Sequence, residues 1–172
     1  MKTMKKLSFA AIAAMMIAFT ACTEDPVEPA PTADEILVGE WYSAGDNVAS
    51  LLSTYFNADS IYAKFNDDNT YHVEQFNIGN ETTIADATFT GTYTTTLTEE
   101  GSVHVIALAQ ENPYVAEASG IFEIIESPEV LWYEVVQTSG TQNVPPTVDG
   151  GFGSTNGGTL GDSNIQKFVR LD

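Results

Sequence analysis

Apolar and polar residues alternate along most of the chain after residue 32. From Ser60 to Phe65 every second residue is apolar, and the same period continues over Thr70–Asn77 after an Asn66-Asp67-Asp68-Asn69 turn. A period of two is typical of half-buried strands, so these two segments predict a hairpin. Residues 82–98 contain nine threonines, a composition that favours pleated strands over helix.

Eight strand-sized segments follow one another, and apolar residues at helical spacing predict one short helix over Val48–Phe56. Successive strands joined by short turns pair with their neighbours, and closure of the sheet hides its edges. We therefore expect an all-β fold, an eight-stranded antiparallel up-and-down barrel. A sandwich with Greek-key connections is the alternative, because alternation does not distinguish closure from stacking. The expected strands are 39–43, 60–65, 70–77, 82–98, 102–110, 116–125, 130–138 and 165–171.

Residues 1–21 have the organisation of a bacterial lipoprotein signal peptide. Three lysines precede the apolar run Leu7–Phe19, which as a helix would rise about 20 Å and so falls short of a hydrocarbon core of about 30 Å. The box Phe19-Thr20-Ala21-Cys22 places small residues before the only cysteine of the chain. We expect Cys22 to carry the lipid anchor. A plain secretory signal with a coincidental cysteine is the alternative.

Residues 22–32 predict an extended tether, since they are rich in proline and carboxylates and lack apolar periodicity. The box and tether resemble those of outer-membrane lipoproteins. Glu24-Asp25 resembles the acidic signal by which some Gram-negative bacteria place lipoproteins on the cell surface. The expected location is thus the outer membrane, through the lipid anchor, with residues 33–172 forming the barrel domain.

The charge balance is strongly acidic. The chain carries 24 acidic and six basic side chains. Only three basic residues follow Cys22, which gives the mature chain a formal charge of −21. Nucleic acid is excluded as a partner, because binding it requires clustered Lys and Arg. A solvated surface is the simplest interpretation. With its one cysteine lipidated the protein has no internal disulfide, and we expect a monomer.

The two ends of the barrel domain resemble the calycins, the superfamily of lipocalins and fatty-acid-binding proteins. Gly39-Glu40-Trp41 on the first strand is similar to their Gly-x-Trp motif, and Arg170 on the last strand to their C-terminal arginine. The resemblance implies that Gly39, Trp41 and Arg170 are structural, with the arginine lying across the indole as a cation–π contact. The Thr-Asp-Tyr motif, disulfide and C-terminal helix of typical lipocalins are absent.

No pattern in the sequence predicts catalysis. His72 and His104 lie on alternating segments without neighbours at metal-ligand spacing, so half-exposed strand histidines are the expected interpretation. The glycine-rich run at 150–154 matches neither a phosphate loop nor a hydrolase elbow. We therefore expect no enzyme activity, no metal and no cofactor.

Residues 139–163 separate two strands with seven glycines and few large apolar groups. Connections this long are either functional or disordered. Phe152 and Leu160 are isolated apolar residues in this segment, and we expect them to form a lid over the barrel opening, with Phe152 nearest the ligand. A mobile linker is the alternative.

Two functions fit a lipid-anchored barrel. The first is a binding module that holds one small apolar or amphipathic ligand. The second is a structural or accessory surface lipoprotein whose barrel is filled by its own side chains and which contacts envelope proteins or glycans. The volume of any interior cavity discriminates between them.

Overall fold

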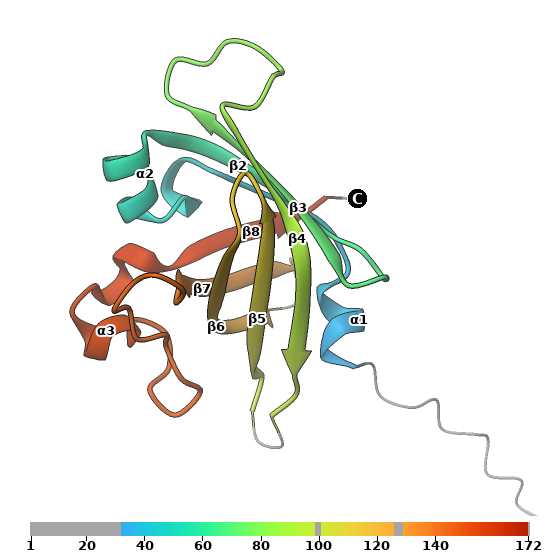
Figure 1. Cartoon of the computed structure of the whole chain (residues 1–172), viewed down its shortest axis with the longest axis vertical. Coiled ribbons are helices and arrows are strands. Elements are labelled where there is room, and N and C mark those ends of the chain that lie inside the picture. The colour runs from blue at the N-terminus through green and yellow to red at the C-terminus, as the bar shows by residue number, and fades with distance from the viewer. Residues whose placement is uncertain (1–31, 99–100, 126–128, 172) are drawn as a thin grey trace, which may run out of the picture. The chain divides into compact units, whose positions relative to one another are not determined.

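The alternating segments form a closed barrel of eight antiparallel strands (Figure 1). The computed structural model describes residues 32–98, 101–125 and 129–171. Each strand pairs with the next along the chain, and β1 (Gly39–Ala44) also pairs with β8 (Gln166–Arg170). The predicted up-and-down barrel is confirmed, and the alternative of a two-sheet sandwich is wrong. The other strands are β2 (Ala58–Phe65), β3 (Thr70–Asn77), β4 (Ala87–Thr96), β5 (Val103–Asn112), β6 (Ala116–Ile125) and β7 (Val130–Gln137).

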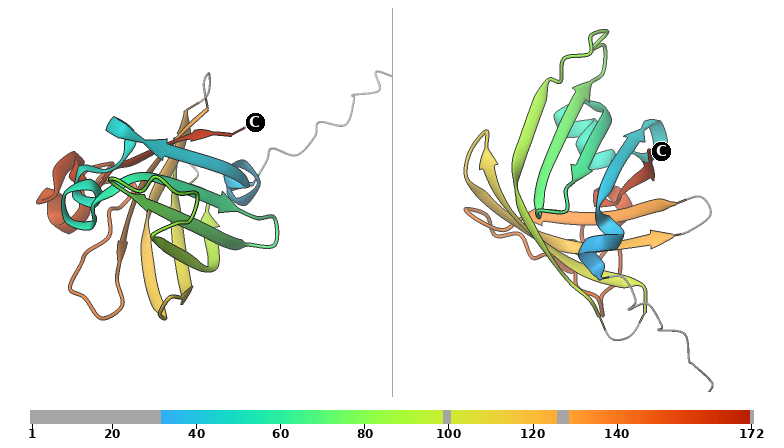
Figure 2. Two further views of the ribbon diagram at one scale, coloured as in Figure 1. Left: turned by 90° about the horizontal axis from the view of Figure 1, so that it is seen from above. Right: turned by 90° about the vertical axis from the view of Figure 1, so that its right-hand side faces the viewer.

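Short helices lie at both ends of the barrel (Figure 2). The helix α1 (Ala33–Leu37) precedes β1, and α2 (Ser50–Phe56) follows it after the 3-10 turn η1 (Gly45–Asn47). The predicted helix at 48–56 is thus confirmed, beginning two residues later. The segment between β7 and β8 contains α3 (Thr155–Gly158) and η2 (Gly161–Asn164). We call the two ends of the barrel the α1 end and the α2 end.

The helix α1 was not expected, although its first residues contain a helix signal. Thr32 and Glu35 form a reciprocal capping box, in which the Thr32 amide donates to Glu35 Oε2 at 2.6 Å and the Glu35 amide donates to Thr32 Oγ1 at 3.3 Å. This exchange satisfies amides that have no partner inside the first turn. The box begins at Thr32, the last residue of the predicted tether.

The strand expected over residues 82–98 is shorter than predicted. The ladder of β4 begins at Ala87, and residues 78–86 form a loop. Side chains there bond to local backbone: Asn80 Oδ1 accepts the Thr82 amide at 2.9 Å, and Asp86 Oδ2 accepts the Asn77 amide at 2.7 Å. Such local bonds compete with strand pairing, which explains why threonine content alone overestimated the strand.

The interior at the α1 end is filled by the protein's own side chains. The side chains of this cluster come from α1 and five strands, and each is at most 1% exposed. They are Leu37, Trp41, Tyr93, Ile106, Phe122 and Leu131.

Candidate functional site

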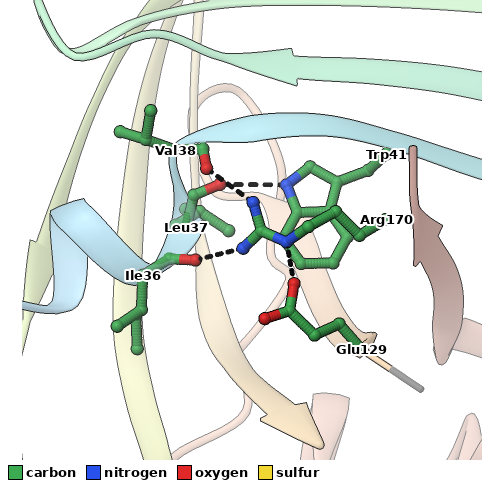
Figure 3. Close-up of polar contacts among 6 residues, drawn as sticks. All are labelled: Ile36, Leu37, Val38, Trp41, Glu129 and Arg170. Carbon is green, nitrogen blue, oxygen red and sulfur yellow. Dashed lines mark hydrogen bonds and ion pairs between the residues drawn. The ribbon is translucent and has the colours of Figure 1, made fainter. Parts of the chain in front are cut away.

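The α1 end is closed by a contact between Trp41 and Arg170, which lie opposite each other on β1 and β8. Figure 3 shows the guanidinium lying over the indole, with its central carbon 4.2 Å from the ring centroid. Trp41 is fully buried, and its Nε1 donates to the Leu37 carbonyl at 2.9 Å. This arrangement joins the first and last strands to the end of α1 and is the contact that the calycin resemblance implies.

The guanidinium of Arg170 uses all three of its nitrogens for structural contacts (Figure 3). The two terminal nitrogens donate to the carbonyls of Val38 and Ile36, each at 2.8 Å, and Nε forms an ion pair with the Glu129 carboxylate. The carbonyls at the end of a helix lack intrahelical partners, and Arg170 satisfies them. Arg170 therefore holds α1 across the barrel end and is not available to a ligand.

Gly39 makes this contact possible. Its φ of +142° is a conformation that L side chains rarely adopt, and a Cβ at this position would collide with the Arg170 guanidinium. Glycine is thus needed for both backbone and space. Gly39, Trp41 and Arg170 are brought together as the sequence analysis expected.

An apolar cavity of about 150 Å³ occupies the other half of the barrel. Tyr133 lines the cavity and contacts the rings of Phe65 and Phe168, with centroid distances of 6.4 and 6.2 Å. Sequence reasoning did not identify this set, because a cavity depends on how the strands are staggered around the barrel. The cavity is lined by Leu52, Ile61, Ala63, Phe65, Val73, Tyr133, Val135, Asn164, Gln166 and Phe168.

A second pocket of about 280 Å³ adjoins this cavity at the α2 end. Leu52, Ile61 and Val73 line both spaces, so the two lie side by side. Phe56 of α2 and Tyr114 between β5 and β6 also line the outer pocket, and they are 57% and 55% exposed. The outer pocket therefore lies between α2 and the β5–β6 connection, beside the cavity.

Two side-chain amides that line the cavity form hydrogen bonds with other groups of the protein. Gln166 accepts the Ala49 amide at 2.7 Å through Oε1 and donates to Ser43 Oγ through Nε2. Asn164 Nδ2 donates to the Val135 carbonyl at 3.3 Å. These bonds hold the α2 connection and η2 against the barrel.

Tyr133 contributes the one tyrosine hydroxyl at the cavity lining, and this hydroxyl forms no hydrogen bond within the described part of the chain. Burial raises the pKa of Tyr133, and the neighbouring Tyr71 raises it further. The hydroxyl therefore stays protonated and keeps both its donor and its acceptor capacity.

The charged groups lie away from the cavity. Of the three cationic side chains in the described residues, Lys64 pairs with Glu40 at 2.9 Å, Arg170 pairs with Glu129, and Lys167 lies over the outer Trp132 ring at 4.4 Å. Neither the cavity nor the outer pocket has a charged side chain among its lining residues.

His104 differs from its expected environment. Its alternating segment predicted a half-exposed strand histidine, but His104 is only 8% exposed and its ring packs against Phe122, with ring centroids 5.4 Å apart. Its Nδ1 has no hydrogen-bond partner among the residues that the structure describes, and burial lowers the pKa of His104. His104 is buried because it occupies the inward phase of β5, the same phase as Ile106 and Leu108 of the core cluster.

The long segment between β7 and β8 is anchored to the outer wall of the barrel by Glu134. This residue is fully buried, and its carboxylate accepts the Gly153 amide at 2.6 Å, the Thr155 amide at 3.2 Å and the Thr155 hydroxyl at 2.5 Å. Sequence reasoning missed this role, because an acidic residue in the outward phase of a strand normally indicates a solvated face.

The residues proposed for a lid lie in this anchored segment. Phe152 packs edge-on against Trp132, with ring centroids 5.6 Å apart. Trp132 points outward, because its neighbours Leu131 and Tyr133 belong to the interior cluster. Leu160 is half-buried, and its carbonyl accepts the Ser163 amide at 3.1 Å. Neither residue lines the cavity, so a lid role stays a prediction that these contacts do not support.

The predicted lipidation site Cys22, the signal peptide at 1–21 and the tether up to residue 31 lie outside the described residues. Within the described part of the chain, no helix has the length and apolar character needed to cross a membrane.

Comparisons with known protein families, with curated proteins and with solved structures found no match for this chain.

Proposed function

We propose that this protein is a lipid-anchored envelope protein whose barrel binds one small apolar or amphipathic ligand. The observation that carries the proposal is the apolar cavity of about 150 Å³ lined by Tyr133, which adjoins a wider pocket lined by Leu52 and Phe56 of α2. Ligand sites in proteins are typically concave and apolar, with few polar groups. A barrel filled throughout would leave no such space.

The size of the cavity bounds the ligand. An apolar cavity of about 150 Å³ accommodates a molecule the size of benzene. The inner space therefore holds one ring or a short alkyl segment, and the outer pocket of about 280 Å³ holds the remainder. A bulky ligand such as a large tetrapyrrole does not fit these two spaces.

The anchor is proposed from the sequence. The Phe19-Thr20-Ala21-Cys22 box and the acidic tether support attachment through lipid on Cys22. Cys22→Ala should release the protein from the membrane fraction, as measured by fractionation and immunoblotting. Retention of the variant in the membrane would contradict the anchor.

Cavity filling tests the binding function. Ala63 lines the cavity and is 1% exposed, so Ala63→Leu should occupy part of the space and lower the affinity for a neutral fluorescent probe, Nile red. Ala107→Leu, at an exposed position on β5, is the matched control. Unfolding curves verify that both variants fold. Equal probe affinity in Ala63→Leu and wild type would contradict binding in this cavity.

A second candidate function has support from the α1 end. That half of the barrel is filled by large side chains such as Trp41, Tyr93 and Phe122, as expected of an accessory lipoprotein that acts through its surface. Mass spectrometry of extracts from the purified, untagged protein distinguishes the two. Absence of any small molecule, together with unchanged probe binding in Ala63→Leu, favours the accessory role.

A further inference from the structure

The lining of the cavity restricts the charge of the ligand, if the binding function proposed above holds. All residues that line the inner cavity and the outer pocket are apolar, amide or tyrosine side chains. The three described cations are engaged elsewhere, at Glu40, at Glu129 and over Trp132. A carboxylate inside the barrel would therefore have no counter-ion.

An unpaired ionised group is unfavourable in an apolar cavity, because it loses its hydration without gaining a partner charge. The formal charge of −18 on the whole chain adds long-range repulsion of anions. The negative charge of the protein attracts an ammonium group at long range, but no lining residue is a carboxylate that could pair with it inside the barrel. Both signs of charge are thus disfavoured within the barrel.

The polar groups of the lining differ in what they can still bind. Gln166 is engaged with Ala49 and Ser43, and Asn164 with Val135. The Tyr133 hydroxyl forms no hydrogen bond in the described part of the chain. Among the amide and hydroxyl side chains that line the inner cavity, Tyr133 is thus the one that forms no hydrogen bond among the described residues, and we assign its hydroxyl to the ligand.

We infer that the ligand is an uncharged amphiphile, bearing a hydroxyl, carbonyl or amide group that forms a hydrogen bond with the Tyr133 hydroxyl while its apolar part extends toward α2. The expected class includes medium-chain alcohols, neutral amides and small ring alcohols. Ionised fatty acids are excluded from the class. Tyr133 acts as a specificity-determining residue.

The test compares three ligands with the same alkyl chain. Isothermal titration calorimetry on the wild-type protein at pH 8 measures the affinities of octanol, octanoate and octylammonium. Octanol should bind at least tenfold more tightly than either ion. Equal or tighter binding of an ion would overturn the inference while leaving the binding function intact. Failure of all three to bind, together with no Nile red binding, would instead contradict the binding function.

The role of Tyr133 is tested separately. Tyr133→Phe should fold normally, because the hydroxyl has no partner among the described residues. It should bind octanol about fivefold more weakly, the effect of one net hydrogen bond. Nile red binding should be retained. Tyr42→Phe, on the outer face of β1 at 40% exposure, is the matched control and should not change either affinity. Unchanged octanol affinity in Tyr133→Phe would overturn the assignment of this hydroxyl.

Discussion

Replacement of Glu134 by alanine should detach the glycine-rich segment from the barrel wall. The carboxylate accepts three donors: the Gly153 amide at 2.6 Å, and the amide and hydroxyl of Thr155 at 3.2 and 2.5 Å. Thr155 and Glu134 are both fully buried. In the variant the two Thr155 donors lose their partner in a place that water does not reach, unless the segment opens.

The expected loss in the free energy of unfolding follows from these contacts. A buried donor without a partner is destabilising by about 1–3 kcal/mol, and two such donors plus the lost packing give about 3–5 kcal/mol for Glu134→Ala. Opening of the segment would limit this loss, because Thr155 would then be hydrated. Glu134→Gln keeps the shape and one acceptor, so we expect a smaller loss of about 1–3 kcal/mol.

Two measurements test this prediction. Urea unfolding gives the change in the free energy of unfolding, and amide hydrogen exchange reports local opening at Gly153 and Thr155. In Glu134→Ala exchange at these amides should accelerate, while the paired amide of Phe122 in β6 stays protected. Glu117→Ala, an exposed outward position on β6, is the control and should change stability by less than about 0.5 kcal/mol. A loss below about 1 kcal/mol with unchanged exchange at Gly153 would refute the anchor.

Two further predictions concern the filled end of the barrel. Trp41→Ala should lower the free energy of unfolding by about 3–5 kcal/mol, because it removes a fully buried aromatic ring and the platform of Arg170; a loss under about 1 kcal/mol in urea unfolding would contradict the closure role. Burial lowers the pKa of His104 from its ordinary 6.5, so below that pH the folded state binds fewer protons than the unfolded state. The contribution of His104 to the free energy of unfolding should therefore be fully present above pH 6.5 and decrease as the pH falls below it. His104→Leu should flatten this slope between pH 7.5 and 5.5, and an unchanged slope in the variant would assign it to other groups.

The predicted barrel was obtained from local pattern alone. Strands such as β2 and β3 have clear alternation and a polar turn between them, and the structure pairs them in register from Phe65 and Tyr71 onward. The start of the strand in the threonine-rich segment was harder to predict, because threonine side chains also form hydrogen bonds with local backbone in loops. The Thr32–Glu35 pair has the sequence pattern of a capping box, but it directly follows a proline-rich run that predicts a tether, so no helix was expected there.

The candidate site could be predicted only in part. Trp41 and Arg170 lie on the first and last strands, and closure of an eight-stranded sheet requires these strands to meet. The cavity beside Tyr133 depends instead on the difference between the interior volume and the side chains that fill it. That difference is set by stagger and tilt of the strands, which no single segment encodes.

The sequence by itself determined the succession of strands and the scarcity of basic residues, because these follow from periodicity and from a count of charges. The choice between a closed barrel and a sandwich was decided by the pairing of β1 with β8. Only the tertiary structure decided whether a given outward-facing or inward-facing side chain is buried and which groups it contacts. Glu134 is in the outward phase of its strand, yet it is fully buried because residues 150–158 fold back over the outer face of the barrel. His104 is a polar residue in the inward phase, and its burial follows from packing against Phe122. A period of two assigns a residue to one face of a sheet, but what covers that face depends on contacts between residues far apart in the chain.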